Sequence, residues 1–310
     1  MITKRSPAPY GFDLTQADHR LLRTSPPAEA LRWCAAAIAP GAEIVRVQPL
    51  AGGMSSAVHA VDVEDGRRRV HRLVLRRMVR PELLEEEPDI LHREATVLEV
   101  VRGCALPTPE LVALDADAEA TDVPALLMTR VPGSVDWRPT DLDGYLRRLA
   151  GALPAIHATP VSVPVRAYAP YELEMHRPPR WSSRPELWTR AFELLESPPP
   201  AAEPCFIHRD YHPGNVLWAG GAVSGVVDWL HASVGSPMVD VGHCRGNLGD
   251  AFGMCAADRF LELYLAASGR DDGYHPYWDV AAALGGLRED DPWAPDAERF
   301  LAHALDARAG

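Results

Sequence analysis

Residues 205–218 have the sequence CFIHRDYHPGNVLW, in which an apolar strand that ends at Ile207 is followed by a polar loop. The loop contains Asp210 and, five residues later, Asn215. A short hairpin, VLWAGGAVSGVVD, then brings Asp228 beside the loop. Mg²⁺ prefers carboxylate, amide and phosphate oxygens, so two of these side chains facing each other across a hairpin can hold it. A further carboxylate in front of them can accept or orient a hydroxyl proton, and phosphoryl transfer requires this combination.

The motif has a recognisable form. His208-Arg209-Asp210, Asn215 and the later Val227-Asp228-Trp229 resemble the catalytic loop and the metal-binding aspartate of the protein-kinase-like superfamily. The version HRDYHPGNVLW…GVVDW is similar to the aminoglycoside phosphotransferase (choline-kinase-like) branch, which has a Trp-type residue after that aspartate in place of DFG. The resemblance spans residues 44–246. It implies an α+β, two-lobed protein-kinase-like fold. The N-lobe, residues 1–130, would be an antiparallel sheet plus a helix that bind nucleotide, and the C-lobe, residues 131–310, would be mainly helical, catalytic and acceptor-binding.

The resemblance also implies roles for individual residues of the motif. Asp210 would orient or deprotonate the acceptor hydroxyl, while Asn215 and Asp228 would bind Mg²⁺. His208 would brace the loop. His212 stands where many protein kinases have a lysine, so it would either touch the transferred phosphate or only fill the loop. Asp240, in GSPMVDVGH, resembles a downstream aspartate of the family that stabilises the catalytic loop.

The N-terminal part supplies candidates for nucleotide binding. Arg76, in LVLRR, stands where the third-strand lysine is expected, and Glu94, in HREATVL, stands where the helix glutamate is expected. An Arg–Glu pair can position phosphates because arginine makes bidentate contacts. Arg77 is the alternative if the strand register differs by one. A small-residue turn between two strands would approach the phosphates closely with Gly52, Gly53, Ser55 and Ser56.

A connector follows the last predicted strand of the N-terminal part. Residues Met128-Thr129-Arg130-Val131 would form the hinge, with backbone groups of Thr129 and Val131 meeting the adenine edge. Together with the motif, this predicts a small-molecule kinase that uses ATP and Mg²⁺.

Composition bounds the class of protein. The 310 residues are 47% hydrophobic and 24% charged, which is typical of a globular protein and excludes a disordered chain, a collagen and a coiled coil. No apolar run approaches the roughly 20 residues of a membrane span, and no signal peptide is visible. A net charge of −12 disfavours nucleic acid and anionic membranes as partners. Five scattered cysteines without a CxxC indicate reduced thiols, and we expect a cytoplasmic location.

Hydrophobic periodicity and turn signals predict the remaining elements. The first 24 residues are expected to be irregular, a helix with Ser25 as its N-cap ends at Pro40-Gly41, and the segment 158–182 is expected to be an irregular insertion or lid. Strands are predicted at 43–50, 57–63, 70–76, 111–114 and 125–128. Helices are predicted at 88–101, 141–157, 185–195, 256–267, 276–284 and 296–307.

Two other functions fit parts of the sequence. In a zinc hydrolase, His208, Asp210 and His212 would bind metal with help from His231 or His243, but Asn215 would then have no role. A pseudokinase-like binding protein would lack one of the three motif residues, and all three are present.

The acceptor is expected to be a small hydroxylated molecule. The segments 158–200 and 243–310 would select it, because they combine acids with aromatic residues, and this combination suits a cationic amine or aminosugar. The same residues are also explained as solvated surface. Amino alcohols, sugars, macrolides and peptide antibiotics are the other candidates. The residues concerned are Glu172, Glu174, Asp250, Asp271, Asp272, Tyr168, Tyr171, Trp181, Tyr274, Tyr277 and Trp278.

Overall fold

The computed structural model describes residues 15–50, 55–270 and 273–306. Over these residues the chain divides into two compact units. Unit 1 contains the chain up to Arg102 together with Thr108–Val131, and unit 2 contains Gly103–Pro107 together with the chain from Pro132 onward. Within the described residues, none of the helices combines the length and the apolar character that crossing a membrane would require.

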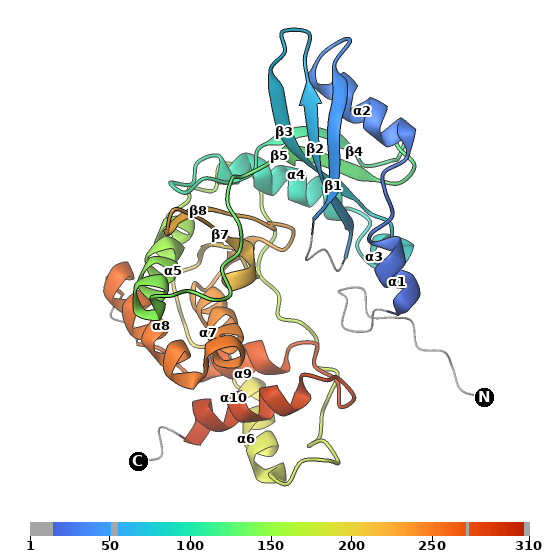
Figure 1. Ribbon diagram of the computed structural model, residues 1–310. Coiled ribbons are helices and arrows are strands. Elements are labelled where there is room, and N and C mark those ends of the chain that lie inside the picture. The colour runs from blue at the N-terminus through green and yellow to red at the C-terminus, as the bar shows by residue number, and fades with distance from the viewer. Residues whose placement is uncertain (1–14, 51–54, 271–272, 307–310) are drawn as a thin grey trace, which may run out of the picture. The chain divides into compact units, whose positions relative to one another are not determined.

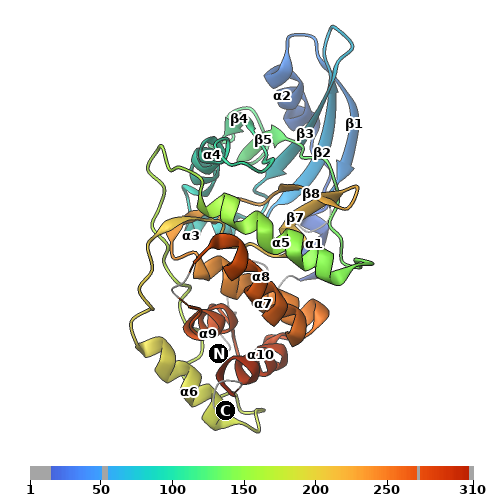
Figure 2. The same cartoon turned by 90° about the vertical axis from the view of Figure 1, so that its left-hand side faces the viewer.

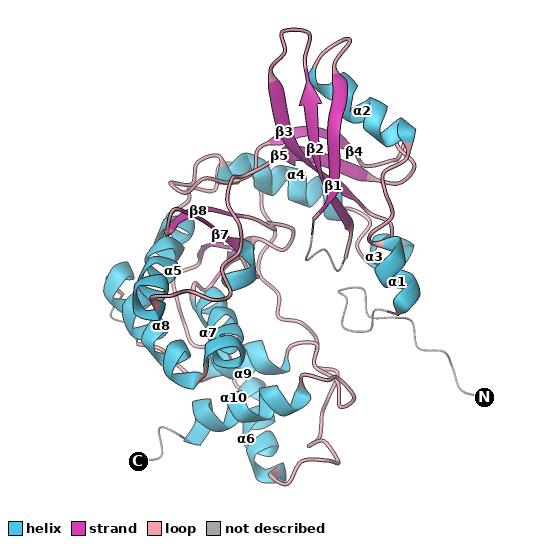
Figure 3. Ribbon diagram, viewed as in Figure 1, coloured by secondary structure: helices cyan, strands magenta, loops and turns pink. Residues whose placement is uncertain are grey.

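Unit 1 is built on a five-stranded antiparallel sheet with the strand order β1-β2-β3-β5-β4 (Figure 3). Residues 65–69 join the second strand to the third, and the dipeptide Asp65-Gly66 in this connection is a local turn signal. Each of the five predicted strands is present. Their bounds are β1 Glu43–Pro49, β2 Ala57–Glu64, β3 Val70–Arg77, β4 Leu111–Asp115 and β5 Ala125–Thr129.

The helices of unit 1 pack on this sheet. Helix α2 (Ala28–Ile38) buries Ala30 and Cys34 against a sheet face that includes Val61, Leu73 and Leu75 (Figure 1). Side chains alternate between the faces of a strand, so the even-numbered residues of β3 face the other way. The remaining helices of this unit are α1 Gln16–Leu21, α3 Pro81–Glu86 and α4 Ile90–Val101.

Two expectations for the N-terminal region were wrong. The first 24 residues are not all irregular, because Thr15 and Asp18 form a capping box that starts α1. Helix α2 begins at Ala28 with Pro27 as its N-cap, and Ser25 lies outside it. Proline has no N–H of its own to satisfy, so it is accepted at the start of a helix even without a side-chain cap.

Unit 2 is mainly helical, and Figure 2 shows α6, α9 and α10 grouped together. These three helices share a core that includes Trp188, Val280 and Leu301. The segment 158–184 has no helix; an isolated bridge at Ala167 and hydrogen bonds from Arg180 and Trp181 to Glu289 connect it to the rest of the unit. The helices are α5 Leu142–His157, α6 Pro185–Glu196, α7 Met238–Phe252, α8 Met254–Ser268, α9 Tyr277–Leu284 and α10 Ala294–Asp306.

Two short strand pairs in unit 2 hold the motif of the sequence analysis. Strand β6 (Cys205–Ile207) pairs with β9 (Ser233–Gly235), and β7 (Val216–Ala219) forms a hairpin with β8 (Ala222–Val226). A 3₁₀ turn, η1 (Pro213–Asn215), precedes the hairpin. The chain therefore leaves one strand pair at Ile207 and enters the other at Val216, and the polar loop lies between them.

Candidate active site

The loop after β6 is held by a buried carboxylate. Asp240, in the first turn of α7, is fully buried and accepts hydrogen bonds from the backbone N–H of His208 (2.9 Å) and of Arg209 (2.5 Å). His157, at the end of α5, lies 3.1 Å from the same carboxylate through Nε2 and 3.0 Å from the Tyr264 hydroxyl through Nδ1. Asp240 thus ties the loop to α5 and α7, which agrees with its expected role.

Two residues of the motif have left-handed backbone conformations. Arg209 has φ 70° and Asp228 has φ 67°, values that are uncommon for residues other than glycine. Such strain persists only where the surroundings over-determine the conformation, and it is often found at functional sites. At Arg209 the two bonds to Asp240 supply part of that constraint.

Asp210 is a half-buried carboxylate with a donor at each oxygen. Its Oδ2 accepts a hydrogen bond from Asn215 Nδ2 (2.9 Å), and its Oδ1 lies 3.0 Å from His243 Nε2. Asn215 Nδ2 also donates to the Asp210 carbonyl (2.9 Å). Burial opposes ionisation of this carboxyl, but the hydrogen bond from His243 and the nearby histidines outweigh it and hold the pKa of Asp210 well below its usual value. Asp210 is therefore an ionised, firmly oriented acceptor.

His208 connects the loop to the strand end that carries Asp228. Its Nδ1 accepts a hydrogen bond from the Asp210 N–H (3.3 Å), so Nε2 carries the proton and donates to the Val227 carbonyl (3.0 Å). The Val227 N–H in turn donates to the Asn215 carbonyl (3.0 Å). These bonds bring the backbone at Asp210, Asn215 and Asp228 together, and the imidazole acts as a brace.

His212 lies beside Asp210 with its ring in a fixed orientation. Its Nδ1 accepts a hydrogen bond from the Gly214 N–H (3.1 Å), and its Nε2 is 3.8 Å from Asp210 Oδ1. Burial lowers the pKa of His212 to about 4, although the Asp210 charge acts in the opposite direction. The ring is neutral at pH 7, with its proton on the nitrogen that faces Asp210.

Arg209 fastens the irregular segment 158–184 to the loop. Its Nη2 donates to the Ala169 carbonyl (2.7 Å), and its guanidinium lies over the rings of Tyr171 (4.3 Å) and Tyr168 (5.4 Å). The backbone N–H of Tyr168 also donates to the Val234 carbonyl in β9 (2.8 Å). The guanidinium of Arg209, the residue before Asp210, is thus anchored to this segment.

In unit 1, Arg76 forms a buried ion pair with the helix glutamate. Its Nε is 3.2 Å from Glu94 Oε1, and its Nη1 donates to Ser56 Oγ (3.1 Å). Arg77, on the opposite face of β3, pairs instead with Asp122. The register therefore selects Arg76 as the partner of Glu94, and Ser56 is brought to the same place.

The expected hinge residues lie in and after β5. Met128 is buried within β5 and Val131 is nearly buried just beyond it. The Thr129 N–H donates to the Glu110 carbonyl (2.9 Å), so this N–H is already used within unit 1. Gly52 and Gly53 lie outside the described residues, while Ser55 and Ser56 are the two residues before β2.

The model of the phosphotransferase enzyme family (APH) matches residues 46–284. The chain belongs to this family. No curated protein sequence gives a match to this member of the phosphotransferase family.

Solved structures resemble most of the length of this phosphotransferase family member. The macrolide 2′-phosphotransferase MphH from Brachybacterium faecium has a TM-score of 0.56 at 15% identity, covering 90% of this chain and 93% of the other. A macrolide 2′-phosphotransferase type I gives 0.57 at 21%, covering 96% and 98%. A thermostable mutant of the aminoglycoside phosphotransferase APH(4)-Ia, in a ternary complex with AMP-PNP and hygromycin B, gives 0.59 at 17%, covering 86% and 95%. The protein therefore has the two-lobed, kinase-like α+β fold that the sequence predicts.

The Asn215 amide shows whether Mg²⁺, which the kinase-like motif implies, fits the residues of this phosphotransferase family member. Both hydrogen bonds of this amide use Nδ2, which assigns Oδ1 as the oxygen that points away from Asp210. An amide oxygen and a carboxylate, as Asn215 and Asp228 provide, are suitable hard ligands for Mg²⁺. Among the described residues, no three His, Cys, Asp or Glu side chains are grouped to hold a metal, so a zinc cluster around His208 has no support there.

One residue of the site was not predicted from the sequence, and some residues predicted to bind the acceptor do not lie on the surface. His243 was considered only as a zinc ligand, whereas it contacts Asp210; its place three residues after Asp240 on one helix face was the available signal. Tyr274 and Trp278 are buried in the core, so they cannot bind an acceptor as expected. Asp271 and Asp272 lie outside the described residues.

Proposed function

We propose that this protein transfers the γ-phosphate of ATP to a hydroxyl of a small molecule. The observation that carries the proposal is the ionised Asp210 carboxylate, oriented by Asn215 and joined through His208 to the strand end at Asp228. A carboxylate beside two hard oxygen ligands is what phosphoryl transfer needs, since its catalysis relies on positioning and charge neutralisation.

We assign Asp210 to bind and orient the hydroxyl of the acceptor. Because its pKa is held well below the usual value, it is a weak base, and its role is to accept a hydrogen bond from the hydroxyl and aim the oxygen at the phosphorus. The neutral His212 can donate from Nε2 to an oxygen of the transferred phosphate. We therefore assign Asp210 and His212 as the catalytic residues.

Asn215 and Asp228 are assigned to Mg²⁺. The assignment of Asn215 Oδ1 and the position of Asp228 directly after the brace at Val227 support this pair. Mg²⁺ would supply charge neutralisation on the nucleotide phosphates. The chain itself keeps Asn215 in place through its bonds to Asp210.

The nucleotide is assigned to residues of unit 1. The Arg76–Glu94 pair is buried and joined to Ser56, so the guanidinium has a fixed orientation for phosphate contacts. The carbonyl of Thr129 and the N–H of Val131 are proposed to bind the adenine edge. The full set is Gly52, Gly53, Ser55, Ser56, Arg76, Glu94, Met128, Thr129 and Val131.

The proposed acceptor class is supported by the overall charge and by the names of the similar structures. A chain with a net charge of −12 favours a cationic over an anionic acceptor. Solved structures of the same fold are named as a macrolide 2′-phosphotransferase and as an aminoglycoside phosphotransferase in complex with hygromycin B. We therefore place hydroxylated amines, aminosugars among them, first among the candidate acceptors.

The test is a screen for phosphorylated product. The protein is incubated with ATP and Mg²⁺ and with aminoglycosides, macrolides, amino alcohols, sugars and peptide antibiotics in turn, and ³¹P NMR detects a new phosphate ester. The Asp210→Asn variant serves as the control for contaminating kinases. Nucleotide binding without any ester formation in the screen would argue for a pseudokinase-like binding protein instead.

A further inference from the structure

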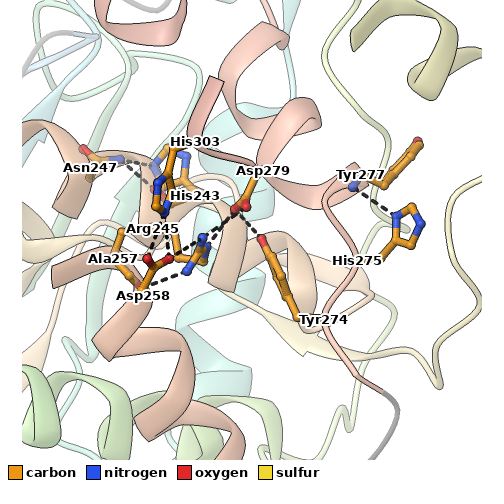
Figure 4. A network of polar contacts seen from close by, with 10 residues as sticks. All are labelled: His243, Arg245, Asn247, Ala257, Asp258, Tyr274, His275, Tyr277, Asp279 and His303. Atoms are coloured by element: carbon orange, nitrogen blue, oxygen red, sulfur yellow. Dashed lines mark hydrogen bonds and ion pairs between the residues drawn. The ribbon is translucent and has the colours of Figure 1, made fainter. Parts of the chain in front are cut away.

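Helix α7 presents a row of polar side chains to the catalytic loop. Asp240, His243 and Asn247 are spaced three and four residues apart, so they share one face of the helix. Asp240 binds the loop backbone, and His243 Nε2 is 3.0 Å from the Asp210 carboxylate. Asn247 Nδ2 donates to the His243 carbonyl (3.0 Å) and lies 3.3 Å from His243 Nε2, as Figure 4 shows.

The orientation of the Asp210 carboxylate is fixed by two donors on different elements. Asn215, at the end of η1, holds Oδ2, and His243, on α7, holds Oδ1. A carboxylate with one donor can rotate about its terminal bond, whereas one with a donor at each oxygen has a defined plane. The His243 ring also meets the His212 ring edge-on, with centroids 5.8 Å apart and an angle of 75°.

The position of α7 is itself fixed by a buried ion pair. Arg245 Nε is 2.9 Å from Asp279 on α9, and its Nη1 donates to the Ala257 carbonyl on α8 (2.9 Å). Tyr274 donates to the same carboxylate (2.6 Å). Figure 4 shows this network beside His243. Helices α8 and α9 therefore hold α7 rigidly, and the imidazole of His243 is presented from a stable base.

We infer that His243 is a positioning residue for phosphoryl transfer, which fixes the Asp210 carboxylate in the plane from which it receives the acceptor hydroxyl. The inference rests on the proposed function. It adds a residue that acts through Asp210, and His243 itself is assigned no contact with the nucleotide. Nε2 of His243 lies 3.0 Å from Oδ1, and the proton of this contact is assigned to Nε2, which donates to the carboxylate oxygen.

Three substitutions separate this role from packing. His243→Ala removes the donor and the volume, His243→Phe keeps a ring without a donor, and His243→Gln places an amide N–H near the position of Nε2. Turnover should fall about 10–100-fold in the Ala and Phe variants, because a small misplacement of a reacting group costs up to about 10²-fold. The Gln variant should recover to within about fivefold of wild type. The nucleotide KM should be unchanged in all three.

A matched control exists in unit 1. His71 Nε2 is 3.0 Å from Asp65 Oδ2, which is a His–Asp pair of the same length with a similarly exposed imidazole. His71→Ala removes this pair from the β2–β3 turn and should leave turnover within about twofold. Equal turnover in His243→Gln and His243→Phe, or wild-type turnover in His243→Ala, would overturn the inference.

A second measurement needs no acceptor. Long-range ¹H–¹⁵N NMR spectra of the full chain should show a proton on Nε2 of His243, and His243→Ala should shift the Asn215 side-chain amide signals. An Nε2 without a proton, or an unchanged Asn215 amide, would refute the inference even if no acceptor is found. Absence of product in the screen with these NMR results intact would refute only the proposed function.

Discussion

Replacing Asp240 by Asn should loosen the catalytic loop. The wild-type carboxylate is fully buried and accepts two backbone N–H bonds, from His208 and from the strained Arg209, while also contacting His157. Asparagine keeps the shape but has one acceptor oxygen. One backbone N–H would then face an amide NH₂ group, and the left-handed conformation at Arg209 would lose part of its support.

The magnitude follows from the bonds that are lost. A hydrogen bond to a charged group contributes about 1.5–3 kcal/mol, and a buried donor left without a partner costs about 1–3 kcal/mol. One such bond is lost and the remaining ones become neutral, so we expect the free energy of unfolding to fall by about 3 kcal/mol. That corresponds to roughly a hundredfold change in the folding equilibrium.

Urea unfolding, followed by tryptophan fluorescence, measures this loss, and turnover is measured on the folded variant. Asp115→Asn is the matched control, since Asp115 is also buried and accepts the N–H groups of Glu119 and Ala120 and the Thr121 hydroxyl, all within unit 1. Both variants should lose comparable stability, and Asp240→Asn alone should lose turnover beyond about tenfold. A loss of less than 1 kcal/mol in Asp240→Asn, or equal turnover in the two variants, would refute the reasoning.

Four further outcomes are expected. Asp210→Asn should lower turnover about 10²–10⁴-fold with ATP affinity intact; near-normal turnover would remove Asp210 from its role. Asp228→Ala should weaken ATP binding in Mg²⁺ but not in EDTA, as calorimetry would show, and equal weakening in both buffers would contradict the metal assignment. Arg76→Met should destabilise unit 1 by about 3–5 kcal/mol in thermal unfolding, because Glu94 is left as a buried charge. Adding Glu94→Leu should restore stability but not ATP affinity. Recovery of both would contradict the role of Arg76 in phosphate binding. As the pH falls from 6.5 to about 4, the free energy of unfolding should fall less in His212→Gln than in wild type. The reason is that the folded wild-type protein resists protonation of His212, whose pKa is lowered to about 4. Parallel curves of stability against pH would show that His212 is not buried as a neutral ring.

The strands of unit 1 and the catalytic loop could be predicted because their signals are local. Alternating Val and Ile residues and the Asp65-Gly66 turn indicate the sheet, and the spacing of Asp210, Asn215 and Asp228 fits a loop followed by a hairpin. The assignment of nucleotide and metal to these residues stays a prediction until it is tested.

Other features depend on contacts that one sequence does not encode locally. His243 reaches Asp210 only because α7 folds back over the loop, 33 positions further along the chain. The choice between Arg76 and Arg77 depends on which face of β3 meets α4, and a shift of one residue would reverse it. Tyr274 looked like a surface aromatic but is buried on Asp279.

The contacts between Arg209 and the segment 158–184 have a consequence for any attempt to change which acceptor the protein uses. The sequence predicts that this segment selects the acceptor, but its contacts with Arg209 mean that it cannot be exchanged independently of the catalytic loop. The guanidinium of Arg209 donates a hydrogen bond to the Ala169 carbonyl and lies over the rings of Tyr168 and Tyr171. A graft from a homologue should therefore carry these three positions unchanged, or be accompanied by Arg209→Gly, which tolerates the left-handed backbone without these contacts.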